Sequence, residues 1–366
     1  MDKTKDRIHY IDIAKGIAMI LVILGHTKKL VPTNVVWWLY TFHMPLFFML
    51  SGMVLNINKY NFKEFFIKKF KTLIISYICL SLIGWFWVMI VRNPTDFVNY
   101  KTLDKLIGIF LGNRGSKYYF SMWFLTALFI AEILIYLYIK LTKNKKVFLI
   151  LGFMISAIIG CLIISRIDKG FYWSLDLVPS AISFGIVGYL LKEYKDKINF
   201  NKLIYILLMF VFLGVNIFVG YMNYKSNGRS DLYELSIGNP VYYYISAISG
   251  SLFVIIISKG IHKERVLEYI GRNSLIYYAY QKSIFITPLL VIRKTLAKQG
   301  GLFTNKNIQL LIVVTGTCVG LAIISEIINK CFPFIIGKFN VSDFINKIKS
   351  RHNKVELMEE KEYEKI

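Results

Sequence analysis

The sequence predicts an all-α integral membrane protein with about ten transmembrane helices. Hydrophobic residues make up 55% of the 366-residue chain and charged residues only 18%, whereas soluble proteins carry about 25% charged residues. Mean hydropathy is +0.51. A chain this apolar cannot cover a soluble globule with polar groups, but a bilayer requires little polar covering.

Ten apolar stretches approach the length of about 20 residues that a helix needs to cross a bilayer. They lie at 10–27, 35–56, 71–91, 119–139, 147–165, 175–191, 203–223, 241–258, 274–292 and 307–329. The first contains Lys15 and is followed by no small-residue cleavage site, so we expect it to be retained. The segment LDKLIGIFLG, within the long connection 92–118, is too short to span and predicts an interfacial or re-entrant helix.

These stretches predict one membrane domain over residues 1–341 and a short charged tail at 342–366. With an even number of spans, both ends of the chain share one side of the membrane. That side holds 28 of the Lys and Arg residues, and the opposite side holds 15. Because Lys and Arg concentrate in cytoplasmic segments, we expect both termini in the cytoplasm and the protein in the plasma membrane.

The basic excess, 45 Lys and Arg against 22 Asp and Glu, gives a net charge of +23. These residues fall between apolar runs, which favours anionic membrane lipids and anionic small molecules as partners and disfavours nucleic acid. The four cysteines are scattered without paired spacing, so neither a disulfide framework nor a metal site is indicated. Nothing in the sequence indicates an oligomeric state.

Ionisable side chains inside a bilayer are costly and are therefore candidates for function. In the first helix, Lys15 and His26 are eleven residues apart, close to three turns, so they share a helix face about 16 Å apart along the axis. Asp12 lies one turn before Lys15. Two interpretations are open: a functional stripe, or an Asp12–Lys15 ion pair at the membrane interface with His26 at the opposite end.

The second helix carries His43 and, two residues later, Pro45. Proline removes a backbone donor, so a kink is expected near His43. By position, His43 lies in the same half of the membrane as His26. A single buried histidine is more often a structural hydrogen-bond donor, but a second imidazole at similar depth favours an acid/base centre.

Glu132 and Lys282 are predicted to lie at similar depth, so they can form an ion pair inside the membrane, either structural or involved in ligand binding. Trp123 is open to two interpretations as well. It is either an interfacial anchor or a surface on which a sugar ring stacks.

These motifs resemble the acyltransferase-3 family of multipass membrane acyltransferases, and within it proteins similar to fucose 4-O-acetylase. The resemblance covers about 7–340. It rests on Lys15 and His26 with Arg7 and Asp12 before them, on Phe42, His43, Pro45, Phe47, Phe48, Ser51 and Gly52, on Lys68, Lys69 and Lys71, on Trp123, Phe124, Leu125 and Leu128, and on Ser274, Leu275 and Tyr278.

The resemblance implies transfer of an acetyl group from acetyl-CoA, used as a co-substrate without a metal, to a hydroxyl of a sugar in a surface polysaccharide or its lipid-linked precursor. His26 is then the base or a transient acyl carrier, and His43 or a backbone donor stabilises the oxyanion. Substrate binding is assigned to Trp123 and to Gln281, where many relatives carry a histidine. Arg7, Asp12 and Glu132 support the site, and the CoA phosphates meet cations: Lys15, Lys68, Lys69, Lys71 and Lys282.

A different class of function is also open. The same intramembrane His, Lys and Glu residues can line the pathway of a transporter that exports a glycan or a small solute. The spacing of Lys15 and His26 and the paired histidines favour the enzyme.

Overall fold

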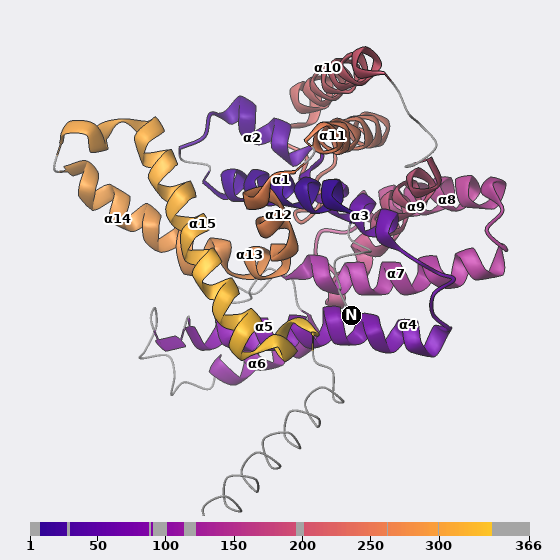
Figure 1. The fold of residues 1–366 in the computed structure, drawn as a ribbon, viewed down its shortest axis with the longest axis horizontal. Helices are drawn as coiled ribbons and strands as arrows, with labels where there is room; N and C mark the ends of the chain where they lie inside the picture. The colour runs from indigo at the N-terminus through magenta and orange to yellow at the C-terminus, as the bar shows by residue number, and fades with distance from the viewer. Residues whose placement is uncertain are drawn as a thin grey trace, which may run out of the picture.

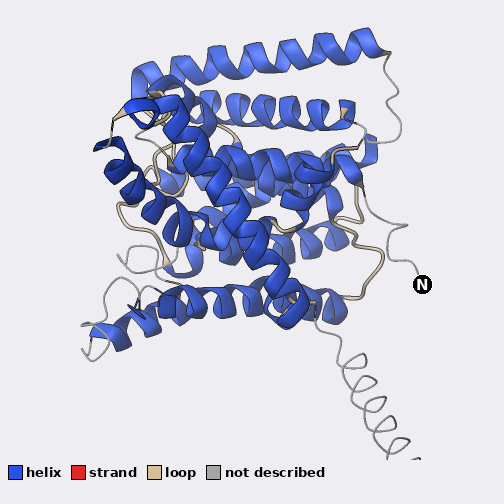
Figure 2. Cartoon of the chain, turned by 60° about the vertical axis from the view of Figure 1, so that its left-hand side comes forward, coloured by secondary structure: helices blue, strands red, loops and turns tan. Residues whose placement is uncertain are grey.

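The computed structural model describes residues 8–27, 30–87, 89–90, 101–112, 122–194, 201–261, 263–298 and 300–338. By length and composition, ten helical segments in these residues can cross a membrane. Each overlaps one predicted stretch, so the predicted ten-helix membrane fold is confirmed. Figure 2 shows helices and loops, and no strand, in the described part of the chain.

Six of the ten spans are single α-helices. They are α1 (His9–His26), α7 (Trp123–Leu141), α8 (Lys146–Ile164), α10 (Lys202–Asn227), α11 (Pro240–Gly260) and α15 (Lys306–Cys331). Each α-helix makes its backbone hydrogen bonds within its own segment, as a bilayer requires, and its long apolar run suits the surrounding lipid.

The other four spans are interrupted, and three of the predicted site residues, Lys71, Gln281 and Lys282, lie in the interruptions. The second consists of α2 (Thr33–Tyr40) and α3 (His43–Val54), and the third of α4 (Phe62–Lys69), the π-helix η1 (Phe70–Ile75) and α5 (Ser76–Trp87). The sixth joins the 3₁₀ turn η4 (Tyr172–Leu177) to α9 (Val178–Tyr194), and the ninth consists of α13 (Ser274–Tyr280), the π-helix η5 (Gln281–Ile286) and α14 (Thr287–Lys298). Single π-turns inside helices frequently mark functional sites.

Helix α1 runs through the middle of the bundle, between α11 and α13 in the view of Figure 1. It contacts α3, α11, α13 and the short helix α12 (Arg265–Arg272), which lies outside the spans. One side of α1 is buried over its whole length, from Ile11 to Gly25. A central helix that is held on several sides gives its polar residues fixed positions, which a catalytic site requires.

The predicted short helix in the third connection is present as α6 (Lys101–Leu111). It packs against α5 and η4: the Tyr77 hydroxyl donates to the carbonyl of Ile109 at 2.6 Å, and the Trp173 indole donates to the carbonyl of Phe110 at 3.0 Å. The predicted tail, 342–366, and Arg7 lie outside the described residues.

Candidate active site

A cavity of about 650 Å³ lies at the end of the bundle where α1 begins. We call this end the lysine end and the opposite one the histidine end. The cavity walls come from the start of α1, the end of α3, the connection to α4, α4 itself and the end of α9. Its lining contains Asp12 and five lysines: Lys15, Lys59, Lys68, Lys69 and Lys192.

The cavity brings together Asp12, Lys15, Lys68 and Lys69, which are four of the predicted site residues. Sequence reasoning did not select Lys59, in the connection between α3 and α4, or Lys192, near the end of α9, because a lysine at such a position is ordinarily solvated. Five cations around one cavity make a site for a ligand with several negative charges, such as a polyphosphate.

Close packing fixes α1 beside this cavity. A Cβ atom at Gly16 would lie 2.2 Å from the carbonyl oxygen of Leu267, so the backbones of α1 and α12 touch at this point. Only glycine permits that approach. The contact lies one residue after Lys15 and therefore fixes the helix turn that presents this lysine to the cavity.

Hydrogen bonds also hold the cavity lysines in place. Lys68 donates to the Tyr60 hydroxyl at 3.0 Å, and its ammonium lies 4.3 Å from the centre of the same ring. The hydrogen bond from Lys68 lowers the pKa of Tyr60 below its ordinary value. Lys192 donates to the carbonyl of Leu55 at 2.6 Å and joins the end of α9 to the end of α3.

Glu132 is paired with Lys69, and the predicted pairing of Glu132 with Lys282 is wrong. The ammonium of Lys69 lies 2.8 Å from Oε1 and 2.7 Å from Oε2 of Glu132, and the Ser51 hydroxyl also donates to Oε1. Residues of the second and third spans thus contact this buried carboxylate, whose Oε2 atom has no hydrogen bond but lies within ion-pair distance of Lys69.

The local helix geometry explains why Lys282 is not the partner. In the π-helix η5, Gln281 is buried at 2% exposure, whereas the next residue, Lys282, is exposed. Lys71 is exposed too, and neither lysine is part of the cavity lining. The Oε1 atom of Gln281 is buried without a hydrogen-bond partner, which is costly in a membrane protein and marks this amide for a ligand or a water.

At the histidine end, the expected kink is a complete break between α2 and α3 at Thr41 and Phe42. Asn216 of α10 stabilises the break by donating to the Thr41 hydroxyl at 3.1 Å. His43 begins α3, is buried, and its Nδ1 lies 2.7 Å from the carbonyl oxygen of Leu39. Because a carbonyl only accepts, Nδ1 carries the proton and the neutral ring keeps its lone pair on Nε2.

This tautomer restricts what His43 can do. As a neutral ring it accepts a hydrogen bond or a proton at Nε2, but it has no N–H left for an oxyanion. The predicted alternative, a backbone donor at the oxyanion, does not depend on this tautomer.

Tyr40 connects the two histidine-bearing helices. Its ring lies edge-on to His43 with the ring centres 4.8 Å apart, and a Cβ at Gly25, next to His26, would meet the same ring at 3.2 Å. His26 itself is half-buried at the last turn of α1. The structure therefore brings the ends of α1 and α2 together around Tyr40, at the level of both histidines.

A loop between α10 and α11, residues 228–239, extends to the same place. The guanidinium of Arg229 lies 4.4 Å from the centre of the Tyr40 ring and pairs with Asp231 at 3.0 Å. The amide of Asn223 donates to the Ser230 hydroxyl at 3.1 Å and to the Ile237 carbonyl at 2.8 Å, so the loop has a fixed shape. Sequence reasoning missed Arg229, since one basic residue in a short connection is no signal.

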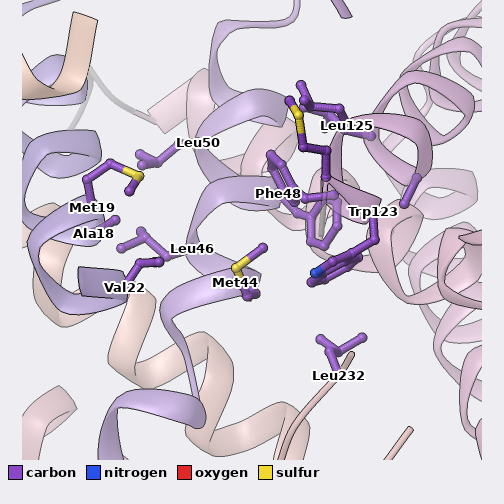
Figure 3. Close-up of a cluster of buried hydrophobic side chains, with 14 of the residues drawn as sticks. Ala18, Met19, Val22, Met44, Leu46, Phe48, Leu50, Trp123, Leu125 and Leu232 are labelled. Carbon is purple, nitrogen blue, oxygen red and sulfur yellow. The ribbon is translucent and has the colours of Figure 1, made fainter. Parts of the chain in front are cut away.

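The remaining motifs meet in the core. Phe124 contacts Phe48 and Tyr278, with ring centres 4.7 and 5.8 Å apart, and Trp123 contacts Phe48 and Tyr233 at 6.5 and 6.2 Å. Figure 3 shows Trp123 beside Phe48, with Leu232 of the loop next to it. Trp123 is only 5% exposed, so it packs inside the protein and does not anchor it at a membrane surface.

A family model described as an acyltransferase domain, acyltransferase-3, matches residues 8–327. The match includes both ends of α1, the second-span motif and the aromatic cluster. The chain belongs to the acyltransferase-3 family. No curated protein and no solved structure matches the chain.

This multipass membrane acyltransferase thus has its candidate groups at two ends of one helix. Lys15 lines the cationic cavity, and His26 lies about 16 Å away along the axis of α1. Within the residues that the structure describes, no group of three His, Cys, Asp or Glu side chains is placed to hold a metal ion.

Proposed function

We propose that this acyltransferase transfers an acetyl group from acetyl-CoA to a sugar hydroxyl of a cell-surface polysaccharide or its lipid-linked precursor, in the plasma membrane. The observation that supports the proposal most is the arrangement of α1, which has a five-lysine cavity at its start and ends at His26, beside the Tyr40 ring that also contacts His43. Family membership gives acyl transfer in general, the lysine cavity supports a phosphate-bearing donor, and the sugar acceptor is what the resemblance to fucose 4-O-acetylase implies.

The cavity matches the head of the donor. Coenzyme A carries a pyrophosphate and a further phosphate on its ribose, and lysine ammonium groups bind phosphate oxygens as point charges. Lys15, Lys59, Lys68, Lys69 and Lys192 supply five such groups around about 650 Å³. Lys71 and Lys282 lie outside this lining and are not assigned to the donor.

The excess of Lys and Arg in the loops on the side of the lysine end supports a cytoplasmic position for that end, where acetyl-CoA is made. The phosphates cannot enter lipid, so the nucleotide remains in the cavity. The pantetheine arm is long and flexible and extends along α1 from Lys15 towards His26, carrying the thioester to the histidine end.

At the histidine end, His26 removes the proton from the acceptor hydroxyl as that oxygen attacks the thioester carbonyl. A C–O bond forms, the C–S bond breaks, and the CoA thiolate leaves and takes up the proton. A general base contributes roughly 10²- to 10⁴-fold to such a reaction. The acetyl group can instead pass first to the His26 imidazole and then to the sugar, with the same net balance.

The proposal is tested by mass spectrometry of surface polysaccharide from cells that lack the gene, from cells complemented with the wild type and from cells that carry His26→Ala. We expect the mass increment of an acetyl group in the wild type alone, with the His26→Ala protein at normal abundance in the membrane. Normal acetylation in the His26→Ala cells would contradict the mechanism, and no acetyl difference between deleted and complemented cells would contradict the acceptor.

A further inference from the structure

The Lys69–Glu132 pair sets one cavity lysine apart from others. Lys69 lines the cavity with 18% of its side chain exposed, whereas Glu132, behind it on α7, is 4% exposed and is not a lining residue. The ammonium donates a hydrogen bond to Oε1 of the carboxylate at 2.8 Å and lies within ion-pair distance of Oε2, at 2.7 Å. A lysine ammonium has three donors, so it can also donate to a ligand in the cavity.

Lys59 and Lys68 have a different environment. The ammonium groups of both lie over the ring of Tyr60, 5.9 and 4.3 Å from its centre, and Lys68 also donates to its hydroxyl. A tyrosine ring orients a cation without cancelling its charge. Lys69, by contrast, offers the cavity a hydrogen-bond donor whose charge is largely compensated by a carboxylate at contact distance.

We propose that Glu132 limits the affinity of the cavity for the polyphosphate head of the donor, so that CoA is released after each transfer. This inference rests on the proposed function. CoA carries the same phosphates as acetyl-CoA, so every phosphate contact binds donor and product equally and adds nothing to the chemical step. A cavity in which the charge of Lys69 is not compensated holds the product longer, and product release then limits turnover.

The architecture shows that this carboxylate is held in place. Ser51 of α3 donates to Oε1 of Glu132, and Lys69 of α4 donates to the same atom, so the carboxylate is fixed by two helices. The Lys69–Glu132 ion pair is costly to bury, and two hydrophobic residues of similar volume would stabilise the fold equally well. A charge-compensating role explains why a carboxylate lies here.

The test is calorimetric binding of CoA and, separately, of inorganic pyrophosphate to the purified full-length protein in lipid nanodiscs. Glu132→Gln preserves the shape and the bond from Ser51 but removes the negative charge. We expect both ligands to bind about tenfold more tightly, with a steeper loss of affinity as salt rises. The matched control is Glu326→Gln, which removes a carboxylate from the exposed Glu326–Lys330 pair of α15 and is expected to bind as the wild type does.

Turnover gives a second readout. In Glu132→Gln we expect a burst of CoA formation in the first turnover, followed by a steady rate several-fold below that of the wild type, because release is slowed and the chemistry is not. A merely structural role would reduce the burst amplitude along with the rate.

Lys69→Met/Glu132→Gln removes both charges and leaves the net charge of the cavity unchanged. We expect its affinity for CoA and pyrophosphate to be within about threefold of wild type. If Glu132→Gln alone does not fold, the double variant is used to test the inference. Unchanged or weaker pyrophosphate binding in folded Glu132→Gln, or a tenfold loss in the double variant, overturns the inference. If the wild type binds pyrophosphate but not CoA, the proposed donor is wrong while the role of Glu132 stands.

Discussion

The guanidinium of Arg229 lies 4.4 Å from the centre of the Tyr40 ring, a cation–π contact that joins loop 228–239 to the helix that precedes His43. The Tyr40 ring also contacts His43, with ring centres 4.8 Å apart. The position of the buried imidazole therefore depends on a residue almost two hundred positions further along the chain.

The first prediction concerns Arg229. Cation–π contacts contribute about 0.5 to 2 kcal/mol, so Arg229→Gln should lower kcat roughly two- to thirtyfold through a displaced Tyr40 and His43. Arg229→Lys retains the cation and should recover part of the rate. The KM for acetyl-CoA should not change, because the lysine cavity is at the other end of α1. Lys225→Gln, an exposed cation near the end of α10, is the control; equal losses in both variants would contradict the positioning role.

The second prediction separates the chemistry of His43 from its structural hydrogen bond. His43→Asn places an amide N–H where Nδ1–H donates to Leu39 and removes Nε2, whereas His43→Ala removes both. If Nε2 acts in catalysis, the two variants should lose activity alike, and less completely than His26→Ala. Near-normal acetyl transfer by His43→Asn would show that His43 is structural.

The ten spans could be predicted from the sequence, because a helix that crosses a bilayer makes its own backbone hydrogen bonds and needs a long run of apolar side chains. The sequence also grouped five lysines in one site, and of these Lys15, Lys68 and Lys69 line the cavity whereas Lys71 and Lys282 do not. It could not predict the partner of Glu132, because depth alone allowed Lys282. The actual partner, Lys69, lies at the end of α4, 63 positions before Glu132, and a contact between such distant segments is set by tertiary packing.

Ser51 and Gly52 belong to the motif of the second span, and the packing of the structure explains why a serine and a glycine stand there. Ser51 donates to Glu132, and a Cβ at Gly52 would lie 2.0 Å from the carbonyl oxygen of Gly185, so α3 and α9 touch there. Loop 228–239 is the opposite case. Its connection to Tyr40 is a contact between distant segments, which neither periodicity nor composition encodes.

The third prediction concerns the contact between α1 and α12. Gly16→Ala places a methyl group 2.2 Å from the Leu267 carbonyl oxygen, so α1 must shift and the protein should lose about 1–3 kcal/mol of stability, with lower abundance in the membrane. Gly214→Ala is the matched control, because a Cβ there meets no atom within 4 Å and alanine favours the helix. Thermal unfolding in detergent should separate the two variants. A Gly16→Ala protein as stable as the Gly214→Ala protein would contradict the close approach.

The fourth prediction is a pH dependence at the lysine end. The hydrogen bond from Lys68 lowers the pKa of Tyr60, so Tyr60 gains a negative charge at a pH below the ordinary tyrosine value of 10.0. A negative charge in the cavity repels phosphates, and CoA affinity should fall as the pH rises through that lowered pKa. Tyr60→Phe should shift this loss to higher pH, as followed by calorimetric titration. Identical pH profiles for the two proteins would exclude Tyr60 as the titrating group.

The last prediction is the sidedness of the transfer, and it follows from the length of α1. Lys15 lines the cavity and His26 lies about 16 Å away along the helix axis, at the opposite end of the bundle. With the lysine end in the cytoplasm, the CoA phosphates stay on that side while the acetyl group reaches the outer half of the membrane. In right-side-out vesicles loaded with labelled acetyl-CoA, label should therefore appear on an added glycan acceptor that cannot cross the membrane, and His26→Ala vesicles should transfer none.

The protein must be active and the vesicles sealed, and retention of the labelled nucleotide shows that they are sealed. If label reaches only acceptors enclosed with acetyl-CoA, then both substrates approach His26 from the cytoplasm, and the path along α1 is wrong.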